Sequence, residues 1–281
     1  MKKIFALLMT LALFVVTGCG STGGDKPSDA KEVKIGMIKR LNVSEEKFGE
    51  FIKQIEDTLK VKIVSHTPVF FDDLNSMQMA LQSGQVAEIS TYHSVARYML
   101  AKDPRFKVLK DHSLEFIDSF CFALRDDETE LRDSLNLVIR EMQDDGTLGR
   151  LTKEYITDIK TDSDPPAIEL PHFDSAQTIK VGVTGDLPPF DFVSADGKPA
   201  GFNTAVLAEI GNRMLKNIEI VDVNAGARAA ALTSGQIDVV FWAIVPASEI
   251  IPSDSDKPVG VILTDPYFKD KIVHVNFNDK K

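Results

Sequence analysis

The chain has 281 residues, of which 43% are hydrophobic and 26% are charged, and its formal net charge is -10. This surplus of acidic side chains argues against nucleic acid and against anionic lipid as binding partners. The length and the hydrophobic content are sufficient for one large domain or for two modest ones.

The first 18 residues are typical of a secretory signal peptide. Two lysines precede an apolar run over residues 4–16, which is too short to remain as a membrane-spanning helix. The run ends in VTGC, which resembles a bacterial lipobox, and this resemblance implies cleavage before Cys19 and lipidation of its thiol. The alternative is an ordinary signal peptide that leaves Cys19 as a free thiol. Residues 19–32, rich in Gly, Ser and Asp, are then expected to form a flexible tether.

An internal repeat is the most informative feature of the remaining sequence. Residues 33–38 (VKIGMI) match residues 179–184 (IKVGVT), and residues 80–86 (ALQSGQV) match residues 231–237 (ALTSGQI). The two offsets are 179 − 33 = 146 and 231 − 80 = 151, so the order and nearly the spacing of the two pieces are kept. This indicates two copies of one structural plan.

The first copy alternates short β-branched runs with amphipathic segments, the pattern of an α/β fold with a mostly parallel sheet. Ser44 is expected to be the N-cap of its first helix, and Gly84 is expected to end its second helix in a left-handed conformation. In chain order, the pattern predicts a strand at 33–38, a helix from 45, a strand at 61–64, a helix from 74, a strand at 87–90, a helix at 95–101 and a strand at 106–109.

The middle of the chain connects the two copies. Residues 116–124 are predicted to form a long strand, and residues 130–156 to be helical except for a break at Asp145 and Gly146. A segment with three prolines then shows no periodicity. The predicted organisation is one lobe at 33–124, closing helices at 125–160, a Pro-rich linker at 161–178 and a second lobe at 179–276.

Four motifs of the second copy, in order and at the right spacing, resemble the first lobe of the family 3 extracellular solute-binding proteins of polar amino-acid ABC importers. They are residues 185–192 (GDLPPFDF), 196–203 (DGKPAGFN), 231–240 (ALTSGQIDVV) and 265–268 (DPYF). Residues 33–158 resemble that family's second lobe and closing helices, with residues 141–148 (EMQDDGTL) similar to the terminal signature.

The resemblance implies a two-lobed periplasmic-binding-protein-like fold of type II, with a hinge between the lobes and the lobes in reversed order, as after a circular permutation. Chain ends that lie close together can be joined in this way, and the Pro-rich linker would be the joint. The alternative is a tandem of two independent, partly degraded domains.

For function, the resemblance implies capture of a small molecule by lobe closure, followed by docking of a monomer on an ABC permease outside the cytoplasm. A receptor that signals to another membrane partner is the alternative, and a dehydratase-type enzyme on the same fold is a remote one. The sequence offers no catalytic motif. Its five histidines are scattered, and its second cysteine, Cys121, has no disulfide partner once Cys19 is lipidated, so neither an enzyme nor a cofactor is expected.

Both halves of the family's amino-acid clamp are missing. By spacing from the 231–240 motif, the family's arginine for the ligand carboxylate would fall near Ile250. On the other lobe, the resemblance implies that the aspartate for the ammonium group would fall near Tyr92. A free α-amino acid is therefore a poor candidate unless Arg228 or Arg40 supplies the charge from another direction.

Aromatic residues are the first group of candidate ligand contacts. The resemblance places Phe190 against the ligand, and the alternative is a core phenylalanine behind the Pro-Pro turn. Trp242, the only tryptophan, follows a strand at the end where ligands bind in α/β lobes, although it could equally pack in the core. Tyr92 and Thr91 offer hydroxyl groups, or are merely solvated.

Polar residues are the second group. Asp186 and Asn203 are predicted either to contact the ligand or to cap the turn and helix that follow them. Arg228, near the start of an Ala-rich helix, is predicted to hold an anion or else to be an exposed surface charge.

Overall fold

The computed structural model describes residues 33–61, 63, 66–109, 115–159, 166–194 and 196–278. These residues belong to one unit, Glu32–Lys281. The predicted signal peptide, the tether and Cys19 lie outside the described residues. Within these ranges, no helix combines the length and the apolar composition that a membrane crossing needs.

The first part of the described chain alternates strands and helices and ends with helices alone. Its elements are β1 (Val33–Ile38), α1 (Glu45–Leu59), β2 (His66–Phe71), α2 (Leu74–Gln82), β3 (Glu88–Tyr92), α3 (His93–Lys102), β4 (Phe106–Val108), β5 (Ile117–Arg125), α4 (Thr129–Asp144), α5 (Thr147–Thr152) and a π-helical turn (Lys153–Thr157).

The second part follows the same plan with an added small sheet. Its elements are β6 (Thr178–Val183), β7 (Asp186–Leu187), β8 (Asp191–Val193), β9 (Pro199–Ala200), α6 (Phe202–Met214), β10 (Asn217–Asp222), a 3-10 turn (Ala225–Ala227), α7 (Arg228–Thr233), β11 (Val239–Pro246), β12 (Val261–Leu263) and β13 (Phe268–Phe277).

Five strands form the first half-sheet, in the order β2-β1-β3-β13-β4. β1 is parallel to β2 and β3, whereas β13 is antiparallel to β3 and β4. Residues 62 and 64 of the strand predicted at 61–64 lie outside the described residues, and the edge strand in the structure is β2, which begins at His66. Its Pro68 cannot donate a backbone hydrogen bond, which an edge strand tolerates.

Five strands form the second half-sheet, in the order β10-β6-β11-β5-β12. β6 is parallel to β10 and β11, and β5 runs antiparallel to β11 and β12. The two half-sheets therefore share one strand order, with three parallel strands followed by an antiparallel strand and a further edge strand. The expected α/β fold with mostly parallel sheets is confirmed.

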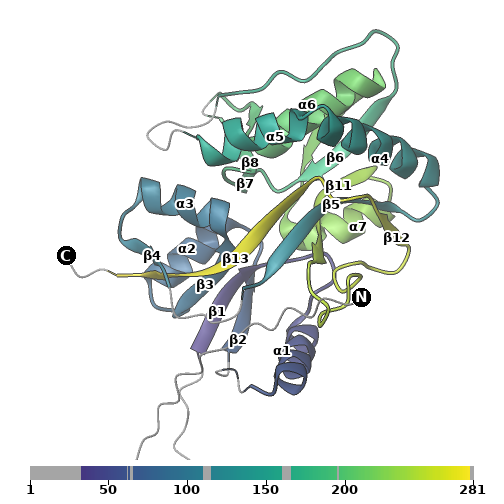
Figure 1. The fold of residues 1–281 in the computed structure, drawn as a ribbon. Coiled ribbons are helices and arrows are strands. Elements are labelled where there is room, and N and C mark those ends of the chain that lie inside the picture. Colours follow the sequence, from purple (N-terminus) through teal and green to yellow (C-terminus); the bar gives the residue numbers. More distant parts are fainter. Residues whose placement is uncertain are drawn as a thin grey trace, which may run out of the picture. The chain divides into compact units, whose positions relative to one another are not determined.

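The chain passes between the half-sheets along β5 and β13, which pair with each other. Phe120 lies opposite Phe268, and Ile117 lies opposite Lys271. Beyond this pairing, β13 continues into the first half-sheet, where Ile272 lies opposite Tyr92. Figure 1 shows β13 in yellow, running from the side of β5 toward β3 and β4. The residues of the first half-sheet thus come from both ends of the described chain.

Local signals in the sequence explain where the helices begin and end. Ser44 is the N-cap of α1 and its hydroxyl accepts a hydrogen bond from the Lys47 N–H at 3.2 Å. Gly84 follows α2 with a φ of 76°. Gly146, with a φ of 79°, separates α4 from α5, as predicted. These three expectations are confirmed. Such features can be predicted because each depends only on neighbouring residues.

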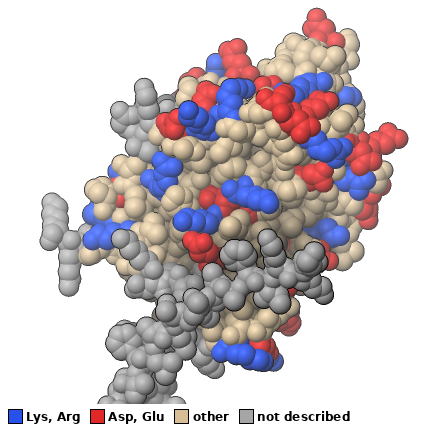
Figure 2. All heavy atoms as spheres, viewed as in Figure 1, with Lys and Arg blue, Asp and Glu red and all other residues tan. Residues whose placement is uncertain are grey.

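The helices α4 and α5 cover the second half-sheet together with α6. The face that α4 buries consists of residues spaced three and four apart, namely Leu135, Val138, Ile139 and Met142. Figure 2 shows acidic and basic side chains interspersed over the helices in the upper part of the view. Surface ion pairs such as Arg213–Asp145, at 2.7 Å, connect α6 to the break between α4 and α5.

Candidate ligand-binding cleft

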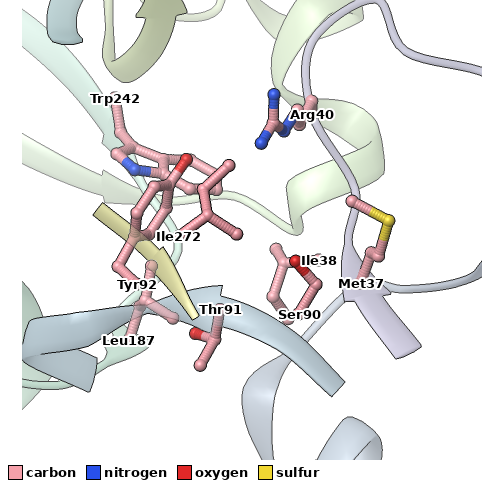
Figure 3. A pocket seen from close by; sticks show the side chains of 9 residues that line it. All are labelled: Met37, Ile38, Arg40, Ser90, Thr91, Tyr92, Leu187, Trp242 and Ile272. Atoms are coloured by element: carbon pink, nitrogen blue, oxygen red, sulfur yellow. The ribbon is translucent and has the colours of Figure 1, made fainter. Parts of the chain in front are cut away.

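A cavity lies where the two half-sheets meet, and residues from both line it. The first half-sheet and the loop after β1 contribute Met37, Ile38, Arg40, Ser90, Thr91 and Tyr92. β11 of the second half-sheet contributes Trp242, β7 of the small sheet contributes Leu187, and the crossing strand β13 contributes Ile272. Figure 3 shows these side chains around one central space. The cavity volume is about 20 Å³, which is room for about one water molecule. The protein's own side chains therefore fill nearly all of the space between the two halves.

Hydrogen bonds across the cleft hold the two halves together. The Leu74 N–H, at the start of α2, donates to Asp186 Oδ2 at 2.7 Å, and the Gly226 N–H donates to Asp72 Oδ1 at 3.0 Å. On another side, the Asn42 N–H donates to Asp256 Oδ1 at 2.9 Å. These three hydrogen bonds join the two halves on both sides of the cavity.

Trp242 occupies a strained position at the cavity wall. The register between β11 and β5 shifts after Val240, which pairs with Ala123, whereas Ala243 pairs with Cys121. Two residues of β11, Phe241 and Trp242, therefore lie opposite a single residue of β5, Phe122. Trp242 has a φ of 77°, which is uncommon for any residue other than glycine. Its side chain is buried, and its indole Nε1 has no hydrogen-bond partner among the described residues. A bulge, and not a regular strand, therefore turns the only tryptophan toward the cleft.

Arg228 holds Trp242 in place. Its Nη1 donates to the Trp242 carbonyl at 2.9 Å, and its guanidinium carbon lies 4.6 Å from the centre of the indole ring. Nη2 reaches across the cleft to the Lys39 carbonyl at 3.0 Å. Arg228 is fully buried, so the alternative of an exposed surface charge is wrong. Burial lowers the pKa of Arg228 to about 10, against the opposing effect of Asp256 and other anionic neighbours.

Aromatic rings from both half-sheets meet beneath the cavity. The ring centre of Tyr92 lies 4.8 Å from that of Phe120, 6.0 Å from that of Trp242 and 6.2 Å from that of Phe190. Phe190 is 1% exposed and does not line the cavity, so in this structure it has the core position that sequence reasoning left open. Tyr92 and Thr91 are buried, so the alternative that they are merely solvated is wrong for both.

Arg40 is placed by an ion pair with a residue of the crossing strand β5. Its Nη2 donates to Asp118 Oδ2 at 2.9 Å, and the Tyr92 hydroxyl donates to the same oxygen at 2.9 Å. Burial works against the charged form of Arg40, but Asp118 and other anionic neighbours raise its pKa above the ordinary value. Arg40 therefore stays charged at the cavity.

Asp186 and Asn203 have structural partners. Asp186 accepts the hydrogen bond from the Leu74 N–H, and burial raises the pKa of Asp186 to about 6. Asn203 donates through Nδ2 to Asp191 Oδ1 at 2.6 Å, and the N-cap of α6 is Gly201. Neither of the two lines the cavity in this structure.

Three acidic residues near the cleft were not expected from the sequence. Asp118, Asp191 and Asp256 are buried, and burial raises the pKa of Asp191 and of Asp256 to about 6 in each case. An aspartate within an apolar strand, such as Asp118 in IDSFCFALR, was the available signal. Among the described residues, no group of three His, Cys, Asp or Glu side chains is arranged to hold a metal ion.

The comparison with protein families agrees with the motifs. Residues 179–250 match the model of the bacterial extracellular solute-binding proteins, family 3. This segment contains the cleft residues Leu187 and Trp242 as well as Arg228. The resemblance that the motifs indicated is confirmed there.

One curated relative is a probable ABC transporter arginine-binding protein, ArtJ, of Chlamydia trachomatis. It is 30% identical over 95 residues, and the match covers 34% of this chain and 34% of the relative. The match thus spans about a third of that relative's length.

Solved structures show weaker likeness. A methionine-binding protein, MetQ, is 12% identical with a TM-score of 0.41, and the match covers 89% of this chain and 85% of that one. A nutrient-binding protein of Burkholderia cenocepacia bound to methionine is 10% identical with a TM-score of 0.38, at coverages of 87% and 84%. Likeness at this level carries no argument about this chain.

Proposed function

We propose that this protein is the solute-binding component of an ABC importer, and that it captures a small solute between its two half-sheets by closing over it. The observation that carries the proposal is the cavity between Tyr92 of β3 and Trp242 of β11, at a boundary that the chain crosses along β5 and β13. A boundary of this kind can act as a hinge, because a pair of strands can twist while each half keeps its own sheet.

The order of the two halves supports a permuted arrangement of the family's lobes. β1 to β4 come first in the chain, and β13 completes their half-sheet at the end. We propose that residues 33–124 and 179–276 correspond to the two lobes, with the helices of residues 125–160 closing the second one. Paired half-sheets that share a strand favour this arrangement over two independent tandem domains.

Binding is tested with the fluorescence of Trp242. A library of small polar, aromatic and charged metabolites is added to the purified full chain, and the indole emission and the thermal midpoint are recorded for each compound. We expect one group of related compounds to change both signals, because Trp242 lies where the two halves meet. If no small molecule changes either signal, and the chain binds only a macromolecule, the proposed function is wrong.

We further propose that the protein is anchored outside the cytoplasm by lipid on Cys19 and passes its solute to a membrane permease as a monomer. Metabolic labelling with an alkyne fatty acid tests the anchor. Cys19→Ala should abolish labelling and release the protein from the membrane fraction. Cys121→Ala is the matched control, because that thiol is buried in β5 and should not take part. Labelling that survives Cys19→Ala would contradict the proposed anchor.

A further inference from the structure

The N-terminus of helix α2 is shared by two carboxyl groups from opposite halves of the molecule. Asp73, the N-cap of α2, accepts a hydrogen bond from the Ser76 N–H at 2.6 Å. Asp186 of β7 accepts one from the Leu74 N–H, at the first residue of the same helix, at 2.7 Å. A helix N-terminus favours a negative charge, but a second carboxylate there is repelled by the first. The contact between the two halves therefore brings like charges together at this point.

Acidic side chains from both halves continue around this contact. Asp72 accepts a hydrogen bond from the Gly226 N–H of the other half at 3.0 Å, and its second oxygen accepts one from Lys39 Nζ at 2.9 Å. Asp222, the last residue of β10, lies beside the start of β7, since a Cβ atom at Gly185 would be 3.5 Å from Asp222 Oδ1. We call this group the acidic seam, and it consists of Asp72 and Asp73 in the first half and of Asp186 and Asp222 in the second.

The surroundings of Asp186 disfavour its charged form. Burial raises the pKa of Asp186 to about 6 from an ordinary value of 3.8, and the hydrogen bond from the Leu74 N–H opposes this increase. The negative charges of Asp73 on α2, Asp191 on β8 and Asp222 on β10 raise the pKa further. Because α2 belongs to the other half, its covering of Asp186 and the charge of Asp73 act only while the two halves are in contact.

We propose that the two halves take up a proton at Asp186 when they close along the acidic seam, so that acid favours the closed arrangement and neutral solution favours an open one. A carboxyl group can accept the hydrogen bond from the Leu74 N–H whether or not it is protonated, so protonation removes the repulsion and keeps the contact. This inference rests on the proposed function, in which the halves open and close, and it adds a condition under which they close.

The direction of the pH dependence follows from the burial of Asp186. The closed arrangement holds the proton more tightly than an open one, in which water reaches the carboxyl group. The contribution of Asp186 to closing is therefore fully present below about pH 4 and is lost as the pH rises through about 6. Between about pH 5 and about pH 7.5, we expect the ratio of open to closed molecules to rise roughly threefold to tenfold.

The test is acrylamide quenching of Trp242, the only tryptophan, in the purified full chain without any added solute. The indole ring is buried where the two halves meet, so quenching should increase when the halves separate. We expect the quenching constant to rise with pH, with a midpoint near about pH 6. At about pH 7.5, raising the NaCl concentration from about 20 mM to about 500 mM should lower the quenching constant, because salt screens the repulsion along the acidic seam.

Variants separate the charge of Asp186 from its hydrogen bond. Asp186→Asn keeps an oxygen that can accept from the Leu74 N–H but carries no charge, so its quenching should stay weak and should not rise with pH. Asp73→Asn keeps an N-cap oxygen but removes the facing charge, and we expect a smaller rise than in the unmodified chain. Asp196→Asn removes an exposed charge between β8 and β9, and as the matched control it should show the full rise.

Two results would overturn the inference. One is quenching that does not change with pH in the unmodified chain, or that changes only together with a loss of far-UV circular dichroism, which indicates unfolding. The other is a rise in Asp186→Asn as large as that in the unmodified chain. In either case, binding of a metabolite in the fluorescence screen at a single pH would leave the proposed function standing.

Discussion

Arg228 and Trp242 form one unit, in which the guanidinium lies 4.6 Å from the centre of the indole ring and donates to the Trp242 carbonyl at 2.9 Å. Nε of Arg228 also donates to the Ala225 carbonyl at 3.2 Å, and Nη2 reaches Lys39 in the other half of the molecule. The buried guanidinium of Arg228 thus supports the strained backbone of β11 and connects it to the other half of the molecule.

Replacement of Arg228 by methionine should destabilise the protein strongly. The variant keeps much of the side-chain volume, but it leaves four carbonyls without their donor and removes a cation that lowers the pKa of two buried acids, Asp191 and Asp256. We expect a loss of about 3 kcal/mol in the free energy of unfolding, measured by urea denaturation. Arg140→Met, which breaks an exposed ion pair with Asp265, should cost less than about 1 kcal/mol. Equal losses in the two variants would contradict the role given to Arg228.

Gly201 is needed for close packing as well as for its backbone conformation. Its φ is 94°, and a Cβ atom there would lie 2.6 Å from the Phe190 carbonyl oxygen. Gly197 also has a positive φ, 78°, but its Cβ would meet nothing within 4 Å. We expect Gly197→Ala to cost roughly 1–2 kcal/mol of unfolding free energy, from strain alone, and Gly201→Ala to cost clearly more. Thermal denaturation of both variants measures the difference, and similar costs would show that the contact with Phe190 is unimportant.

The hydrogen bond from the Leu74 N–H to Asp186 should matter for closure. Asp186→Ala removes an acceptor that joins α2 to β7 across the cleft, so the open form should become more populated. We expect acrylamide to quench Trp242 more efficiently in this variant, because opening exposes the indole ring. Asp196→Ala, in the exposed turn between β8 and β9, is the matched control and should behave like the unmodified chain. Equal quenching in all three proteins would show that Asp186 does not hold the cleft closed.

Buried carboxyl groups should make the stability fall between about pH 4 and pH 6. Burial raises the pKa of Asp191 to about 6 from an ordinary value of 3.8, so the folded state holds the proton more tightly than the unfolded state. This contribution is present below pH 4 and is lost as the pH rises through 6, in total roughly 1–3 kcal/mol. Asp191→Asn should therefore show a weaker decline than the unmodified chain in urea denaturation over this range.

The control for the pH experiment is Asp196→Asn, because that carboxyl group is exposed. Its decline between pH 4 and pH 6 should match that of the unmodified chain. Glu88 acts in the opposite direction and at lower pH. Burial opposes ionisation there, but hydrogen bonds from His274 and His66 lower the pKa of Glu88 to about 2, so that its contribution is lost only as the solution becomes more acidic than pH 4. A decline in Asp191→Asn as steep as that of the unmodified chain would contradict the assignment to Asp191.

Features that depend on neighbouring residues could be predicted from the sequence. Ser44, Gly84 and the break at Gly146 mark helix ends through short-range hydrogen bonds and glycine conformation, and all three are found where expected. The strand predicted at 61–64 falls partly outside the described residues, whereas the aromatic and β-branched run that follows it, HTPVFF, forms β2.

Features that depend on distant residues could not be predicted. The burial of Arg228 requires four carbonyls, one from the 3-10 turn, two from β11 and one from the loop after β1, which only the folded chain brings together. The role of Asp118 depends in the same way on Arg40 and Tyr92, residues far from it in the sequence. The sequence motifs predicted an α/β plan for each half of the chain. The contacts in the cleft depend on residues that are far apart in the sequence, so only the folded structure shows them.

The passage of β13 into the first half-sheet has a consequence for biosynthesis. β4 pairs with β13, and β3 gains its second neighbour from β13, so this half-sheet stays incomplete until the last strand has been made. The strands of the second half-sheet, from β5 to β12, are consecutive in the chain and can assemble earlier. During synthesis, therefore, the half that the ribosome produces first finishes folding last. Until β13 pairs with β3, the edge of β3 is exposed and has to be protected from pairing with other chains.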